Sequence, residues 1–174
     1  MKRAREQRRR PSGFTLIEIL VVLVIMGIML ALVAIKLAPD DKRVLETEAL
    51  RLSLLLEQAH DEAVAGAQQI AWTADAGGYR FWRRDEKGAW LPYQGEQLFR
   101  ERAFGEGVRF VGLQLDHTWA EPGQRLVFSP SGIGLPFSAV LALGGERLAV
   151  SGDGFGQVRV SAESGDAGLA AASG

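Results

Sequence analysis

A long run of apolar residues near the N-terminus constrains this chain more than any other feature of its sequence. The run continues without a charge from Ile19 to Ile35, which is 17 residues and about 26 Å of helix. A helix counted from Phe14 to Ile35 would measure about 33 Å, enough to cross the hydrocarbon core of a bilayer. The h-region of a secretory signal peptide is shorter, roughly 7–15 residues. The sequence therefore predicts a transmembrane helix over residues 14–36.

One carboxylate, that of Glu18, precedes this run and follows a Gly13–Phe14 junction. A carboxylate within a bilayer helix costs roughly 2.5–3.5 kcal/mol even on a lenient insertion scale, so the charge needs a partner. Cleavage after Gly13 would supply one, because it creates a free α-amino group on Phe14. Two alternatives remain: Glu18 reaches the lipid headgroups, or the segment is an ordinary uncleaved signal anchor.

Charge divides the chain at the same junction. Residues 1–13 carry a net charge of +5, and the remaining residues carry a net charge of −6. Basic residues beside an apolar run favour a cytoplasmic leader and an exported C-terminal domain. An acidic domain disfavours binding to nucleic acid. The chain has no cysteine, which excludes disulfides and thiolate metal sites.

A second helix is predicted over residues 37–66. Pro39 predicts a kink or a short break, and Asp40 or Asp41 is placed to cap a restarted helix. Gly66 predicts the C-terminal end of the helix. Between these two ends, apolar residues recur at spacings of three and four, which puts them on one face of the helix. These residues are Leu45, Ala49, Leu52, Leu56, Ala59 and Ala63.

Residues 67–160 show the pattern of an antiparallel β domain. Strands and turns alternate at short intervals, with hairpin turns at residues 75–78 and 144–145. The strand over 108–115 changes its inward face at Gly112, which predicts a β-bulge. Residues 161–174 are small and carry little apolar bulk, so a disordered tail is expected. The fold class predicted is α+β, a helix packed on an antiparallel β-sandwich.

The N-terminal junction resembles the signal of type IV pilin-like proteins, which prepilin peptidases recognise. The resemblance rests on Gly13, Phe14 and Glu18, with Thr15-Leu16-Ile17 between them and a short basic leader before them. It implies that residues 1–13 are removed, that Phe14 is N-methylated, and that the Glu18 carboxylate meets the N-terminal amine of an adjoining filament subunit.

Residues 8–160 also resemble the H-type minor pseudopilins of the type II secretion system. Residues 48–63 and 79–82 carry this resemblance, together with the turns at 128–132 and 152–156. It implies a type IV pilin-like fold and a place near the tip of a periplasmic pseudopilus that helps export folded proteins. The chain would be anchored in the inner membrane beside other minor and major pseudopilins, with its C-terminal domain in the periplasm.

Two other readings stay open. A minor pilin of a type IV pilus would share this architecture, and a signal-anchored periplasmic binding or enzymatic domain is the alternative from another class. Neither His60 nor His117 has neighbours at metal-ligand spacing. Ser129, Ser131 and Asp153 lack a G-x-S-x-G elbow and fit turn positions. No catalytic residue, metal site or cofactor is therefore predicted. Four tryptophans are expected in the core or at interfaces: Trp72, Trp82, Trp90 and Trp119.

Overall fold

The computed structural model describes residues 15–37, 41–93 and 98–163. They form two units: helix α1 belongs to the first, and every element from α2 onward belongs to the second. Gly13, Phe14, Pro39, Asp40 and the predicted tail from 164 onward lie outside the described residues. The kink at Pro39 therefore stays a prediction.

Helix α1 spans Leu16–Leu37, so it begins two residues later than the predicted start at Phe14. Thr15 caps it, because its hydroxyl oxygen Oγ1 accepts the backbone N–H of Glu18 at 3.4 Å and thereby satisfies a free donor of the first turn. Within the described part of the chain, no helix has the combination of length and hydropathy needed to cross a membrane. The transmembrane assignment of 14–36 stays a prediction from the sequence.

Helix α2 spans Asp41–Ala65 and buries the predicted apolar stripe completely. Its C-terminal end differs from the prediction in one respect. Gly66 follows the last helical residue as expected, but Ala67 adopts the left-handed conformation, with φ of 49°. The backbone N–H of Gln68 donates to the carbonyl oxygen of Ala63 at 3.2 Å, and that of Ala67 to Val64 at 3.3 Å. These two bonds form a Schellman motif in which alanine occupies the position that glycine usually takes.

The first β-sheet, sheet A, is antiparallel and is built around the hairpin of β1 and β2. Within the described residues its strand order is β3-β2-β1-β7, and β4 also pairs with β2. Asp75 stabilises the β1–β2 turn by accepting the backbone N–H groups of Gly77 and Gly78. The strands are β1 (Ile70–Ala74), β2 (Gly78–Arg84), β3 (Trp90–Pro92), β4 (Arg102–Ala103) and β7 (Leu126–Phe128).

The second β-sheet, sheet B, is also antiparallel, with the order β10-β9-β8-β5-β6 among the described strands. The predicted bulge is confirmed, because the pairing of β5 with β8 shifts between Phe110 and Gly112. A two-residue turn joins β5 to β6 through Asp116 and His117, both at positive φ, as a type I′ hairpin requires. The strands are β5 (Arg109–Leu115), β6 (Thr118–Trp119), β8 (Phe137–Leu143), β9 (Glu146–Gly152) and β10 (Val158–Ala162).

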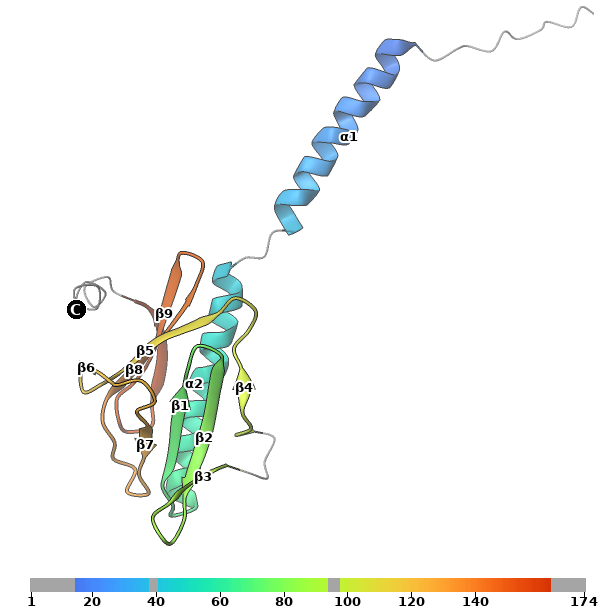
Figure 1. Ribbon diagram of the computed structural model, residues 1–174. Helices are drawn as coiled ribbons and strands as arrows, with labels where there is room; N and C mark the ends of the chain where they lie inside the picture. Colours follow the sequence, from blue (N-terminus) through green and yellow to red (C-terminus); the bar gives the residue numbers. More distant parts are fainter. Residues whose placement is uncertain (1–14, 38–40, 94–97, 164–174) are drawn as a thin grey trace, which may run out of the picture. The chain divides into compact units, whose positions relative to one another are not determined.

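Helix α2 supplies the core that both sheets share. Its buried residues form one cluster with side chains of sheet A, such as Trp72 and Phe81, and of sheet B, such as Leu141 and Val150. Figure 1 shows α2 running behind β1 and β2 in this view, and α2 contacts β1 of sheet A and β8, β9 and β10 of sheet B. A helix with one apolar stripe needs this arrangement, because only packing against another layer removes the stripe from water.

The structure corrects the predicted start of the C-terminal tail and adds two short strands. The tail was expected to begin at residue 161, but β10 continues to Ala162, where it pairs with Leu148 of β9. Glu163 is also ordered, since its carboxylate lies 3.3 Å from Arg147. The short strands β4 and β6 were not predicted, because two-residue strands carry no periodic signal.

Candidate functional site

The N-terminal site predicted from the sequence is described only at Glu18, since Gly13 and Phe14 lie outside the described residues. Glu18 occupies the first turn of α1 and is exposed. A carboxylate there interacts favourably with the positive end of the helix dipole. The pairing predicted for Glu18 involves the terminus of another chain, so its role stays a prediction.

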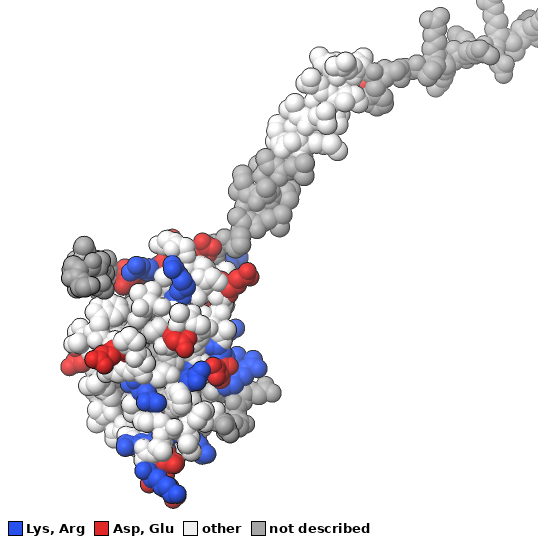
Figure 2. All heavy atoms as spheres, viewed as in Figure 1, with Lys and Arg blue, Asp and Glu red and all other residues white. Residues whose placement is uncertain are grey.

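Apart from Glu18, the side chains of α1 that the structure describes form an apolar surface on every side. Its described side chains, at residues 16–29, are all exposed; Leu16 is 83 % exposed and Leu23 is 63 % exposed. Figure 2 shows the described part of α1 almost free of charged atoms, whereas both signs of charge are spread over the second unit. A helix that is apolar all round is stable where lipid or other helices cover it.

A second candidate site lies on sheet A, on the face of β2 opposite the buried side chains of Tyr79 and Phe81. Because side chains alternate along a strand, Arg80, Trp82 and Arg84 share this face. Trp90 of β3 pairs with Arg84, and Arg125 comes from the loop before β7. We call these five residues, Arg80, Trp82, Arg84, Trp90 and Arg125, the Arg–Trp face.

The guanidinium groups of the Arg–Trp face lie over its indole rings. The guanidinium carbon of Arg125 lies 5.0 Å from the ring centre of Trp82 and 5.7 Å from that of Trp90. Arg80 lies 5.7 Å from the Trp82 ring, and Arg84 lies 5.9 Å from the Trp90 ring. All four distances are within the range of cation–π attraction, so arginine and tryptophan alternate as one connected array.

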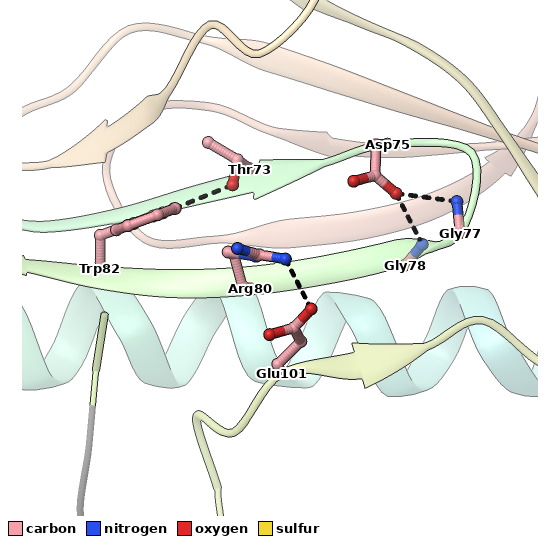
Figure 3. A network of polar contacts seen from close by, with 7 residues as sticks. All are labelled: Thr73, Asp75, Gly77, Gly78, Arg80, Trp82 and Glu101. Carbon is pink, nitrogen blue, oxygen red and sulfur yellow. Dashed lines mark hydrogen bonds and ion pairs between the residues drawn. The ribbon is translucent and has the colours of Figure 1, made fainter. Parts of the chain in front are cut away.

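Hydrogen bonds hold part of this array in place, as Figure 3 shows. The indole Nε1 of Trp82 donates to the hydroxyl oxygen of Thr73 at 2.9 Å, which fixes the ring on the β1–β2 hairpin. Arg80 donates to the Glu101 carboxylate at 2.6 Å. The Nε of Arg125 is buried and has no hydrogen-bond partner among the described residues.

A hollow of about 510 Å³ borders the array. Its lining includes Arg80, Trp82, Arg102 and Arg125, with Asp75 and Glu101 as the acidic members. The Asp75 carboxylate already accepts two backbone N–H groups, and Glu101 is paired with Arg80. The hollow thus offers cationic side chains and one indole face to an incoming group.

The other residues singled out from the sequence have structural surroundings. The ring of His60 packs edge-on against Phe128 at 6.4 Å, and His117 is exposed in the β5–β6 turn. Asp153 accepts the backbone N–H of Phe155 at 2.8 Å within its turn. In the part of the chain that the structure describes, no three His, Cys, Asp or Glu side chains could hold a metal ion together.

Sequence reasoning did not identify the Arg–Trp face as a site. The signal was present in residues 80–84, Arg-Phe-Trp-Arg-Arg, where cations and an indole alternate with a core residue. Arg125 stands 41 positions beyond Arg84, so only the placement of β7 beside β1 brings it to this face.

Comparisons with known proteins agree with this architecture. Residues 8–34 match the family model described as the prokaryotic N-terminal methylation motif. Residues 48–162 match the model described as type II transport protein GspH. The second match covers more than half of the chain and includes α2 and both sheets from residue 48 onward.

Curated relatives carry the name type II secretion system protein H. The protein of that name from Pseudomonas aeruginosa is 36 % identical over 86 residues, which are 48 % of this chain and 50 % of the relative. That from Aeromonas hydrophila is 29 % identical over 94 residues, 53 % of this chain and 51 % of the relative. The chain therefore spans about half the length of the curated relatives it matches.

A solved structure supports the fold. The crystal structure of the minor pseudopilin EpsH from the type II secretion system of Vibrio cholerae superposes with a TM-score of 0.58 at 18 % identity. The alignment covers 71 % of this chain and 96 % of that chain. The α+β fold predicted from the sequence is thus confirmed as the fold of that pseudopilin. The match over residues 48–162 shows that the chain belongs to the type II transport protein GspH family.

Proposed function

We propose that this chain is a minor pseudopilin, a non-catalytic subunit of a periplasmic pseudopilus in a type II secretion system. The observation that carries the proposal is that one chain contains two parts in sequence. An apolar helix with a single carboxylate in its first turn precedes a compact domain of the GspH family.

The proposed maturation begins at the N-terminal junction. A prepilin peptidase cleaves after Gly13 and the new terminus at Phe14 is N-methylated, as the matched methylation motif suggests. Before assembly, the basic leader stays on the cytoplasmic side of the inner membrane and the folded domain lies in the periplasm. Other minor and major pseudopilins are the proposed partners.

Glu18 is the residue proposed to guide assembly. In a filament, the apolar surface of α1 is covered by the helices of neighbouring subunits. A carboxylate in such surroundings is stable only with a close cation. The N-terminal amine of an adjoining subunit would provide that cation and would set the axial register of one helix against the next.

The test is co-expression of Glu18→Leu with prepilin peptidase and partner pseudopilins, followed by affinity recovery of the partners. We expect the variant to insert into the membrane at least as well as the parent, because the carboxylate adds cost to insertion. Its thermal unfolding should match the parent, because Glu18 lies outside the folded domain. Recovery of partners should fall roughly ten-fold, since a charge-assisted contact is lost. Glu18→Asp keeps the charge and serves as the matched control. Gly13→Leu should remain a longer precursor by mass spectrometry.

Three outcomes would contradict parts of the proposal. Parental recovery and secretion by Glu18→Leu would remove the assembly role of Glu18. Recovery of type IV pilus subunits in place of pseudopilins would move the chain to a pilus. A mature protein that does not start at Phe14 would favour a signal-anchored periplasmic domain.

A further inference from the structure

The Arg–Trp face is unusual in its charge. The chain after residue 13 is acidic, with 14 basic and 20 acidic residues. Four of those basic residues nevertheless gather here: Arg80, Arg84 and Arg125 in the array, and Arg102 in the lining of the adjoining hollow. The acidic neighbours Asp75 and Glu101 are engaged by two backbone N–H groups and by Arg80. The four arginines outnumber the two acidic neighbours, so this face of an acidic domain carries a local excess of positive charge.

The array is also built for recognition of carboxylates. Stacking on ring faces holds a guanidinium in one orientation and leaves its N–H groups to donate in the plane of the group. Arg125 lies within cation–π distance of two indoles, and its Nε lacks an acceptor among the described residues. A carboxylate can take two parallel N–H bonds from such a group. An acidic side chain therefore has the chemistry that the N–H groups of this guanidinium can bind.

The residue types favour a protein as the source of that carboxylate. Tryptophan and arginine are the side chains most enriched among residues that dominate protein–protein binding energy. Trp82 and Trp90 are only partly buried, so both rings keep apolar surface for a partner. The hollow of about 510 Å³ that Trp82 helps to line falls in the size range of binding pockets and has room for side chains.

We propose that the Arg–Trp face docks an acidic surface segment of a partner protein, with Arg125 pairing with a partner carboxylate. The proposal deepens the pseudopilin function by giving the chemistry of one lateral partner, and it rests on that function for the existence of the partner. Its site is separate in sequence from Glu18 and α1, so the two can fail independently.

The experiment measures binding of labelled decapeptides to the full chain in detergent by fluorescence anisotropy. One probe alternates glutamate and leucine, and its counterpart has glutamine in place of glutamate. We expect the glutamate peptide to bind more tightly than the glutamine peptide, and Arg125→Gln to weaken its binding roughly ten-fold, the loss expected for a charge-assisted pair. Arg159→Gln removes an exposed arginine of β10 and should change binding by less than about two-fold.

Further variants separate the possible causes. Arg84 is exposed, so Arg84→Gln keeps the test open if Arg125→Gln does not fold, which thermal unfolding will reveal. Arg84→Gln should also weaken binding of the glutamate peptide. Arg125→Lys keeps the charge but loses the planar guanidinium group. Weaker binding of the glutamate peptide by this variant would show that the stacked guanidinium, and not charge alone, is needed. Glu18→Leu should bind like the parent. Loss of peptide binding in that variant would show that the signal depends on the filament helix and not on this face.

Several results would overturn the inference. Equal binding of the glutamine peptide would show that carboxylates are not recognised. Unchanged binding by folded Arg125→Gln and Arg84→Gln would place the site elsewhere. Heparin binding that is tighter than peptide binding and equally dependent on Arg125 would make the ligand an anionic polysaccharide and not a protein.

Discussion

Tyr79 places a phenol group in the core of the second unit. The side chain is 2 % exposed, and its hydroxyl has no hydrogen-bond partner among the described residues. Burial raises the pKa of Tyr79 above its ordinary value, and the nearby carboxylate of Glu48 raises it further. Glu48 is not part of the apolar stripe of α2, but it is only 5 % exposed and accepts two bonds from Arg51, at 3.3 and 3.2 Å.

Because the pKa of Tyr79 is raised, the stability of the domain should decrease with rising pH in the alkaline range. Tyr79 ionises near pH 10 when the chain is unfolded and at a higher pH when it is folded. The stabilisation is therefore complete below about pH 10 and is lost as pH rises through the pKa of the folded state. Tyr79→Phe should change the free energy of unfolding by less than about 1 kcal/mol at pH 7. Above pH 10, the free energy of unfolding should decrease less with rising pH in this variant than in the parent.

The measurement is chemical unfolding from pH 7 to 11 for the parent, Tyr79→Phe and Tyr93→Phe. Tyr93 provides the control because it is half-buried and its hydroxyl lies 3.5 Å from a Glu62 carboxylate oxygen. If Tyr79→Phe follows the pH profile of the parent, the buried phenol does not cause the alkaline loss.

At the scale of the element, α2 decides how the two sheets share a core. Its stripe is fully buried, and Leu52 at its middle is 0 % exposed. Leu54, two residues away on the same helix, is 61 % exposed. The same substitution at these two positions therefore separates the effect of burial from that of helix propensity.

Leu52→Asp should destabilise the domain by more than about 3 kcal/mol, because it removes a core side chain and buries an unpaired carboxylate. Leu54→Asp should change stability by about 0.5 kcal/mol or less. Thermal and urea unfolding of both variants provide the comparison. Equal losses at the two positions would mean that α2 does not pack through its predicted stripe.

At the scale of the whole molecule, the core belongs to one unit. Every residue of the buried cluster lies between Leu45 and Val150, within the unit that begins after α1. Within the described residues, the unit extends to the ion pair of Arg147 with Glu163. The folded unit is therefore longer at its C-terminal end than the 67–160 β domain expected from the sequence.

A fragment of residues 41–163 should fold without α1 and unfold in a single cooperative transition, because it contains the complete core cluster. Circular dichroism during heating tests this expectation. A shorter fragment that ends at residue 157 removes β10 and is the matched comparison. It should melt at a lower temperature, since β9 loses the pairing partner that covers one of its edges. A fragment 41–163 without a cooperative transition would contradict the assignment of the core.

Local sequence determined the parts of this protein that rest on periodicity or on short motifs. The spacing of Leu45, Leu52 and Leu56 predicted the buried face of α2, because helix geometry alone brings such positions together. The change of inward face at Gly112 predicted the bulge in β5, because side chains alternate strictly along a regular strand. The family followed from a continuous stretch of sequence, as the match over residues 48–162 shows.

Only the tertiary structure decided which distant residues meet. Arg125 joins Trp82 and Trp90 because β7 pairs with β1, and no local pattern specifies that pairing. Glu48 is buried even though its position on the helix lies beside the stripe. Ala67 takes a left-handed conformation that alanine disfavours. At Ala67, packing of the domain outweighs a local cost of roughly 1–2 kcal/mol. In all three cases the deciding contacts come from distant parts of the chain, so they cannot be read from neighbouring residues.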